Sequence, residues 1–217
     1  MTSSFPSFAV GAAWQRAGAL TLAAAGLLSG GAAQAADAQP QAGGSLILAQ
    51  SSFPPCLDLA QSARAQNASR QALDTLLDQD KRTGQVVPWL ADRWEYLDEG
   101  KTLRLHLRSG VTFSNGEPLD AKAVKANFDA LAAYAKEGRA PQAGGYLTGY
   151  LGADVIDDST VALRFDHPKA GFLQALTEKT LAPLALATLA RTPEERCQGA
   201  LIGTGPFVID QVVKNDK

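Results

Sequence analysis

Residues 88–121 read PWLADRWEYLDEGKTLRLHLRSGVTFSNGEPLDA, and this stretch decides the fold. Apolar and polar side chains alternate along two arms, Arg93–Tyr96 and Leu103–Arg108, and the turn Asp98–Lys101 lies between them. Alternation with a period of two places one set of side chains on a buried face and the other set in solvent. The stretch therefore predicts a β-hairpin with one buried face, and Asn115–Gly116 predicts a further turn beyond it.

The residues that follow predict a helix and then a second hairpin. Asp120 is a favourable N-cap, and apolar residues recur at helical spacing from there to about Ala135. Glycines and prolines indicate a loop over Gly138–Gly149, and Asp157–Ser159 is the expected turn of the second hairpin. Two short helices are expected after it, at Gly171–Leu176 and Pro183–Leu189.

Three more segments have a pattern of their own. The uncharged run Ser45–Ala49 predicts a strand that is buried on both faces. Apolar residues three and four positions apart predict an amphipathic helix within Gln61–Leu77. Ile202–Asp210 predicts a glycine turn that leads into a strand. Because the residue before a proline favours extended geometry, Ser51–Cys56 is expected to be an extended loop.

Composition is that of a globular protein and excludes some partners. The 217 residues are 46% hydrophobic and 19% charged, with 20 basic and 22 acidic side chains. Nucleic-acid binding normally needs a basic surface, and peripheral membrane binding a basic helix. The sequence has neither, so we expect no nucleic acid and no lipid surface among the partners.

The N-terminus has the pattern of a secretory signal peptide. Arg16 is the only charged residue among the first thirty, and an apolar run follows it over Ala17–Leu28. Ala33–Ala35 is a small-x-small cleavage site, so we expect residues 1–35 to be removed on export. A membrane anchor is the alternative, but the run is shorter than the roughly 20 residues that span a bilayer. Residues 36–44 are then a flexible leader, and no cysteine near the cleavage site offers a lipid anchor.

The chain has two cysteines, Cys56 and Cys197. In an oxidising compartment an isolated pair favours a disulfide, and the sequence has no Cys-x-x-Cys motif or histidine cluster that indicates a metal site. Two buried free thiols are the alternative. We expect a disulfide, no bound metal and no cofactor.

No catalytic constellation is present in the sequence. A Gly-x-Ser-x-Gly motif is absent, and the two histidines, His106 and His167, have no partners at zinc-binding spacing. Gly203–Gly205 lacks the lysine and the further glycine of phosphate-binding loops. Trp89 and Trp94 are expected to pack in the core, with stacking on a ligand as the alternative. The chain is therefore expected not to be an enzyme.

The order of the motifs resembles the peptide/nickel family of extracytoplasmic solute-binding proteins. Pro88–Trp94 is similar to that family's P-x-L-A-x-x-W, and residues 98–121 are similar to its G-x-T…F-x-L-R-x-G-V-x-F-x-x-G-x-P-l-x-A stretch. Four shorter matches come in the same order: Gly44–Leu46, which is similar to the family's opening strand, then Leu57–Asp58, Leu73–Leu77 and Gly203–Phe207.

The resemblance implies an α/β fold of the periplasmic binding protein type II class. It implies two lobes that close on a ligand, of which residues 45–217 are an incomplete N-terminal lobe with a mixed sheet, β-hairpins and flanking helices. The chain stops at Lys217 without a closing helix, so we expect it to be truncated. Family members line the ligand cleft with the loop after the first strand, which is Ser51, Ser52 and Phe53 here. An ordinary loop held by Cys56 is the alternative.

The implied function is that of the periplasmic substrate-binding component of an ABC importer. Such a protein captures a peptide or a related small solute, delivers it to membrane permease subunits and acts as a monomer. The alternatives are an exported hydrolase with its catalytic residues in a missing part, and a periplasmic sensor or chaperone module on the same scaffold. The sequence does not specify the solute.

Overall fold

The computed structural model describes residues 43–49 and 52–213, and the chain divides into two units, Met1–Leu48 and Ala49–Lys217. The described residues of the first unit form no helix or strand, and Leu46, Ile47 and Leu48 are exposed. The expected strand Ser45–Ala49 is therefore wrong. An extended segment becomes a strand only when a neighbour takes up its backbone hydrogen bonds, and no described strand pairs with it.

The second unit contains a four-stranded antiparallel sheet with the order β3-β4-β6-β5. Both predicted hairpins are confirmed. One pairs β3 (Ala91–Leu97) with β4 (Thr102–Leu107), and the other pairs β5 (Tyr150–Asp157) with β6 (Thr160–Phe165). A mixed sheet was expected, but the strand pairs of the described residues are all antiparallel because each joins a hairpin arm to a neighbouring arm.

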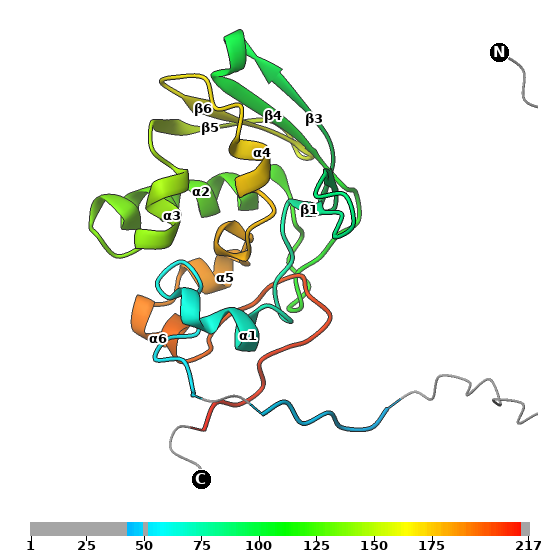
Figure 1. The fold of residues 1–217 in the computed structure, drawn as a ribbon, viewed down its shortest axis with the longest axis vertical. Helices are drawn as coiled ribbons and strands as arrows, with labels where there is room; N and C mark the ends of the chain where they lie inside the picture. The colour runs from blue at the N-terminus through cyan, green and yellow to red at the C-terminus, as the bar shows by residue number, and fades with distance from the viewer. Residues whose placement is uncertain (1–42, 50–51, 214–217) are drawn as a thin grey trace, which may run out of the picture. The chain divides into compact units, whose positions relative to one another are not determined.

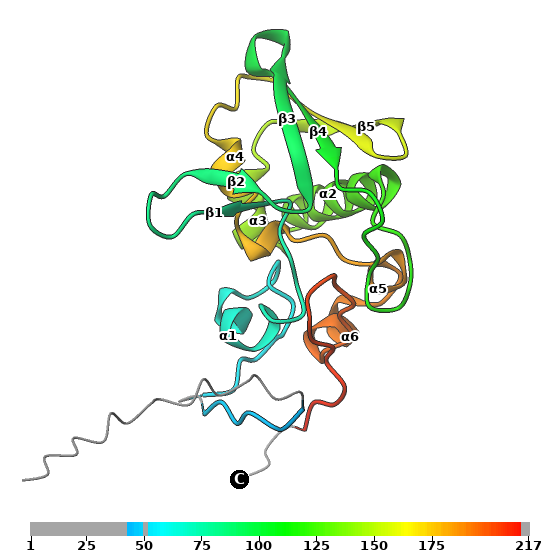
Figure 2. The same ribbon diagram turned by 90° about the vertical axis from the view of Figure 1, so that its right-hand side faces the viewer.

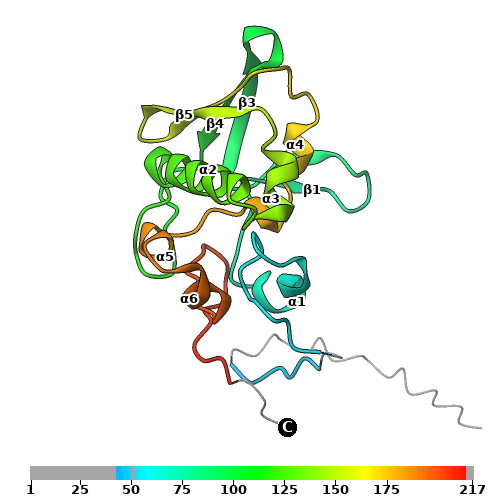
Figure 3. The ribbon, with the colours of Figure 1, turned by 90° about the vertical axis from the view of Figure 1, so that its left-hand side faces the viewer.

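The helix α2 (Ala121–Lys136) covers one face of this sheet (Figures 1 and 3). The carboxylate of Asp120 accepts a hydrogen bond from the backbone N–H of Ala123 at 2.8 Å, which confirms the predicted N-cap. The expected loop after α2 contains one short helix, α3 (Pro141–Tyr146), with its proline in the first turn.

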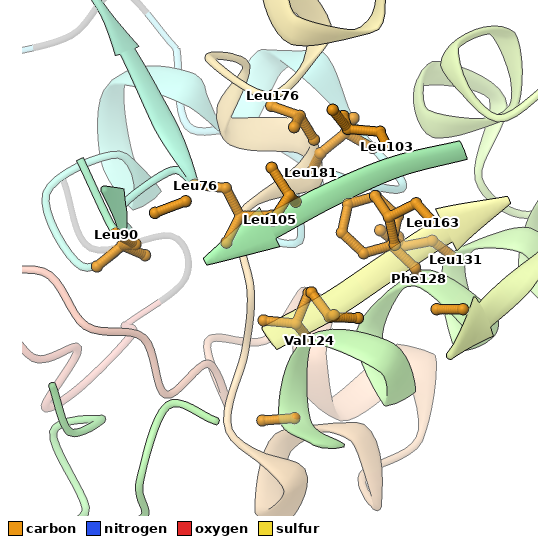
Figure 4. Close-up of a cluster of buried hydrophobic side chains, with 14 of the residues drawn as sticks. Leu76, Leu90, Leu103, Leu105, Val124, Phe128, Leu131, Leu163, Leu176 and Leu181 are labelled. Carbon is orange, nitrogen blue, oxygen red and sulfur yellow. The ribbon is translucent and has the colours of Figure 1, made fainter. Parts of the chain in front are cut away.

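The main core lies between α2 and the inner face of the sheet (Figure 4). Period-two alternation directs Leu103, Leu105 and Leu163 toward the helix, and helical spacing directs Val124 and Phe128 toward the sheet. All five are at most 1% exposed. The hydrophobic effect on these side chains therefore fixes both the strand register and the rotation of the helix.

A second, two-stranded sheet pairs β1 (Leu77–Gln79) with β2 (Val86–Pro88), and this hairpin extends to one side of the unit (Figure 2). The predicted helix over Gln61–Leu77 is largely wrong. Only the short turns η1 (Ala63–Ala65) and α1 (Gln66–Ser69) are helical. Beyond them the carbonyls of Gln71 and Ala72 accept hydrogen bonds from a distant segment instead of from the next helical turn.

The last part of the chain is a series of short helices. The two that were expected are present in shorter form as α4 (Phe172–Ala175) and α5 (Leu186–Leu189). They are accompanied by η3 (Lys179–Leu181) and α6 (Pro193–Cys197). The expected strand within Ile202–Asp210 does not form. Its backbone groups bond to single residues of several segments, among them Gln71, Ala72, Ser114 and Thr188, and to no one neighbouring strand, so no ladder develops.

Candidate functional site

Two of the three residues expected to contact a ligand lie on an exposed loop. Ser52 is exposed and Phe53 is 54% exposed, whereas Ser51 lies outside the described residues. Pro54, the next residue, is buried. The loop therefore presents one hydroxyl and one aromatic ring to solvent.

A disulfide joins the end of this loop to the end of α6. The bridge links Cys56 to Cys197, and the N–H of Leu57 donates to the carbonyl of Cys197 at 3.0 Å. Asp58, two residues after Cys56, forms an ion pair with Arg196, the residue before Cys197. We call the four residues Cys56, Asp58, Arg196 and Cys197 the clasp.

The ion pair of the clasp is almost completely buried. Nε of Arg196 donates to Oδ2 of Asp58 at 2.9 Å, and the two side chains are 2% and 5% exposed. The guanidinium also lies 4.7 Å from the ring centre of Tyr134 and donates to its hydroxyl at 3.0 Å. Burial opposes the positive charge, but the hydrogen bonds to Tyr134 and Asp58 hold the pKa of Arg196 above its ordinary value.

The short sequence motifs meet at a second place, which we call the signature junction: Gln71–Asp74, Ser114 and Ile202–Phe207. There the N–H of Gly205 donates to the carbonyl of Ala72 at 3.1 Å, and the N–H of Ser114 donates to the carbonyl of Gly203 at 2.9 Å. The hydroxyl of Thr204 donates to the carboxylate of Asp74 at 3.2 Å. Three motifs that are far apart in the sequence are thereby joined.

Glycine is required at two positions of the junction by close backbone contact. A Cβ atom on Gly203 would lie 2.1 Å from the carbonyl oxygen of Ala72, and one on Gly205 would lie 2.5 Å from that of Gln71. Real Cβ atoms essentially never come that close. The Gly-Thr-Gly motif thus allows two backbones to touch.

Lys179 connects η3 to the junction. Its ammonium donates to the carbonyl of Leu73 and lies 3.8 Å from Oδ1 of Asp74. Burial lowers the pKa of Lys179, although Asp74 and Asp78 oppose this effect. One partly buried cation therefore neutralises the carboxylate that holds Thr204.

The internal cavity between the clasp and α2 is too small for a solute. Its volume is about 20 Å³, and Asp58, Asn127, Tyr134, Lys179 and Arg196 are among its lining residues. Such a volume holds about one water molecule. Ser52 and Phe53 do not line it.

Two open grooves lie beside β5: one of about 430 Å³ is lined by α2 and α3, and one of about 210 Å³ is lined by α2 and β5. Alanines and glycines form much of their lining, and the two grooves share Ala132, Lys136 and Tyr150. Of the expected ligand loop, the described residues Ser52 and Phe53 line neither groove.

The described residues offer no metal site and no group of His, Cys, Asp and Glu that could hold one. His106 lies near Thr160 and Glu95 on the outer face of the sheet, and His167 contacts the neighbouring Asp166, so the two histidines are not brought together. Trp94 packs against the main core, whereas Trp89 is 43% exposed. Within the described residues, no helix combines the length and the apolar character needed to cross a bilayer.

Sequence reasoning missed the pairs Asp58–Arg196 and Asp74–Thr204. Each aspartate stands in a motif that was noted, but nothing in a linear pattern indicates a partner that is 138 or 130 residues away. Arg196 gave no signal at all, because it lies on a polar four-residue stretch that reads as solvent-exposed.

Comparison with known proteins gives one family and several partial relatives. The protein-family model described as "Bacterial extracellular solute-binding proteins, family 5 Middle" matches residues 85–217. The "Probable deoxycholate-binding periplasmic protein YgiS" of Escherichia coli is 31% identical over 62% of this chain and 28% of that protein. The "Probable di/tripeptide-binding protein 5" of Pseudomonas aeruginosa is 29% identical over 82% of this chain and 38% of that protein.

A solved structure is similar as well. The periplasmic binding protein DppA from Helicobacter pylori, in complex with the peptide STSA, aligns with a TM-score of 0.59 and 25% identity. The alignment covers 75% of this chain and 36% of that one. The chain therefore spans less than two fifths of the length of each of these three proteins.

Proposed function

Because the chain belongs to family 5 of the bacterial extracellular solute-binding proteins, we propose that it is part of the capture component of an ABC importer. Residues 1–35 direct export to the periplasm and are removed, residues 36–44 are a leader, and residues 45–217 belong to the first lobe of a two-lobed protein. The family is one of binding proteins rather than enzymes, so the solute leaves unaltered.

The solute class that we propose is a short peptide or a similarly sized small molecule. Relatives and similar structures are named for di- and tripeptides, glutathione, nickel and deoxycholate, and a peptide is bound in the similar DppA structure. Peptides and glutathione share a polar backbone with free termini. Exposed hydroxyl and backbone groups, as on the Ser51–Phe53 loop, suit such a ligand.

In this proposal the exposed loop contributes one wall of the site, with Ser51 and Ser52 as hydrogen-bonding groups and Phe53 as an apolar surface. The clasp and the signature junction hold the loop and the 202–207 segment on a rigid base. Because this base is already ordered, ligand binding loses less conformational entropy there. Closure by the other lobe then presents the loaded protein to the permease subunits.

The observation that carries the proposal is the family match over residues 85–217. The signature junction supports it, because Ser114 and Ile202–Phe207 lie within that match and bond to each other and to Gln71–Asp74.

The test begins with the protein isolated from a periplasmic extract of its own host. N-terminal sequencing is expected to start at Ala36 or within a few residues of it. Native mass spectrometry is expected to show a small solute that unfolding releases unchanged, and calorimetry on the refolded protein measures its return, with a panel of di- and tripeptides alongside. A protein that stays in the cytosol with residues 1–35 uncut, or one that converts its solute, contradicts the proposal.

A further inference from the structure

The loop that carries Ser52 and Phe53 has no hydrogen bond of its own within the described structure. Among residues 43–49 and 52–213, no backbone or side-chain hydrogen bond involves Ser52–Pro55. Two of the four residues are prolines, which have no N–H to donate. Pro54 is nevertheless buried, whereas Ser52, Phe53 and Pro55 are exposed.

The chain is held firmly as soon as it passes Cys56. The N–H of Leu57 donates to Cys197, and its carbonyl accepts from the hydroxyl of Ser69 at 2.6 Å. Asp58 then accepts from the N–H of Ala60 at 3.0 Å, from Gln61 at 2.8 Å and from Arg196 at 2.9 Å. The disulfide thus lies between a loop that forms no hydrogen bond to another described residue and a densely bonded segment.

The other end of the bridge is well anchored. Thr192 and Glu195 form a capping box at the start of α6, and Arg196 is fixed by the buried ion pair. The carbonyl of Cys197 also takes up the N–H of Leu57. Cys197 therefore remains in place whether or not its sulfur is bonded.

From this geometry we propose that Cys56 and Cys197 are positioning residues, and that their disulfide orders the Ser52–Pro55 loop. Reduction by a dithiol transfers two electrons and two protons to the pair, giving two thiols, while the dithiol becomes a disulfide. The loop is then released as far as Leu57, and the rest of the fold is kept. The role of this loop as a ligand wall rests on the proposed function.

The consequence for binding follows from entropy. When the loop is already ordered, binding of a ligand loses no loop entropy. When the loop is released, binding must order it, and the lost conformational entropy weakens the affinity. Fixing a few backbone residues lowers affinity by about tenfold or more. Reduction is therefore expected to weaken capture without removing any residue that touches the solute.

The test measures backbone order by ¹⁵N relaxation on the exported protein without any ligand. Oxidised protein is compared with protein in dithiothreitol, both in trimethylamine N-oxide, which stabilises the folded state. The amides of Ser52 and Phe53 are expected to fall from order parameters of about 0.8 to below about 0.6, while those of Leu105 and Val161 stay unchanged. Reoxidation restores the first values, and a Cys56→Ser/Cys197→Ser variant resembles the reduced protein.

A Leu105→Ala variant is the matched control, because it destabilises the main core without touching the clasp. It is expected to leave Ser52 and Phe53 ordered. The inference is overturned if the loop stays ordered after reduction, if Leu105→Ala releases it equally, or if reduction collapses the amide spectrum of the whole sheet. Since no ligand enters the measurement, a protein that showed this response but bound no solute would contradict only the proposed function.

Discussion

Arg196 and Asp58 place a guanidinium and a carboxylate where water is almost excluded. Replacing Arg196→Met leaves the Asp58 carboxylate buried without its cation. We expect the free energy of unfolding to fall by about 3–5 kcal/mol, the usual cost of one unpaired buried charge. Urea unfolding of both proteins measures the difference.

The double variant Asp58→Asn/Arg196→Met removes both charges, and it is expected to recover part of that loss. Arg104→Met is the control, because Arg104 and Glu95 form an ion pair with side chains 34% and 45% exposed. Exposed pairs contribute less than about 1 kcal/mol. Equal losses from Arg196→Met and Arg104→Met would mean that the clasp pair is not isolated from water.

Lys179 gives the protein a pH dependence whose sign follows from burial. Its pKa is lowered in the folded state, so between that value and 10.5 the folded protein binds fewer protons than the unfolded chain. The free energy of unfolding contributed by Lys179 therefore rises with pH over this window and is lost as the pH falls through the folded pKa.

The measurement is the difference in unfolding free energy between wild type and Lys179→Met, from about pH 7 to about pH 10. Groups common to both proteins cancel, including Asp74, Asp78 and Arg70, which surround the ammonium. The difference should shift in favour of the wild type as the pH rises. A flat difference would show that the ammonium is fully solvated, and a falling difference would show that the attraction of Asp74 and Asp78 outweighs the effect of burial.

Among the elements, the 202–207 segment depends on two glycines. Gly205→Ala forces a Cβ against the backbone of Gln71 and Ala72, and neither neighbour is a flexible side-chain end that can move aside. We expect a loss of roughly 1–3 kcal/mol, as for overpacked sites, with faster hydrogen exchange at Ala72 and Phe207. Gly145→Ala in α3 is the control. A Cβ there meets nothing within 4 Å, so the helix should gain up to about 1 kcal/mol. Similar effects at both glycines would contradict the close contact.

The sequence predicted those elements whose side-chain pattern and partners are local. The two hairpins and α2 are confirmed because period-two alternation, a turn and an N-cap all lie within about 20 residues of each other. The prediction of a helix over Gln61–Leu77 was largely wrong because the partners of this segment are distant in the sequence. Its carbonyls at Gln71 and Ala72 bond to residues 207 and 205, and a partner so distant in sequence overrides helix propensity.

For the site, the sequence predicted single residues but not their partners. Ser52 and Phe53 are exposed, and what they bind is still a prediction. The aspartates at 58 and 74 were noted within motifs, yet their pairing with Arg196 and Thr204 depends on how α6 and the 202–207 segment return to the start of the chain. Contacts between segments so far apart in the sequence depend on the tertiary fold, and a local sequence pattern does not predict them.

At the scale of the molecule, the disulfide closes a loop with a sequence separation of 141 residues. By the chain-entropy estimate, a bridge of this span contributes about 5 kcal/mol by restricting the unfolded state. Thiol titration of the denatured protein should find no free thiols before reduction and two after it. Two thiols before reduction would exclude the bridge. Guanidinium unfolding with and without dithiothreitol measures its stabilising effect.

The central pairing of the sheet also has a consequence for how the protein reaches its native state. β4 pairs with β6, and His106 and Thr160 in this pair are 54 residues apart. The β3–β4 hairpin can form within microseconds, but β6 must be brought in across that distance, and non-local pairing of this kind is slow. Until β6 pairs with β4, Leu103 and Leu105 are expected to be exposed to solvent on an incomplete sheet. Newly made chains are therefore expected to be most prone to aggregate at that stage.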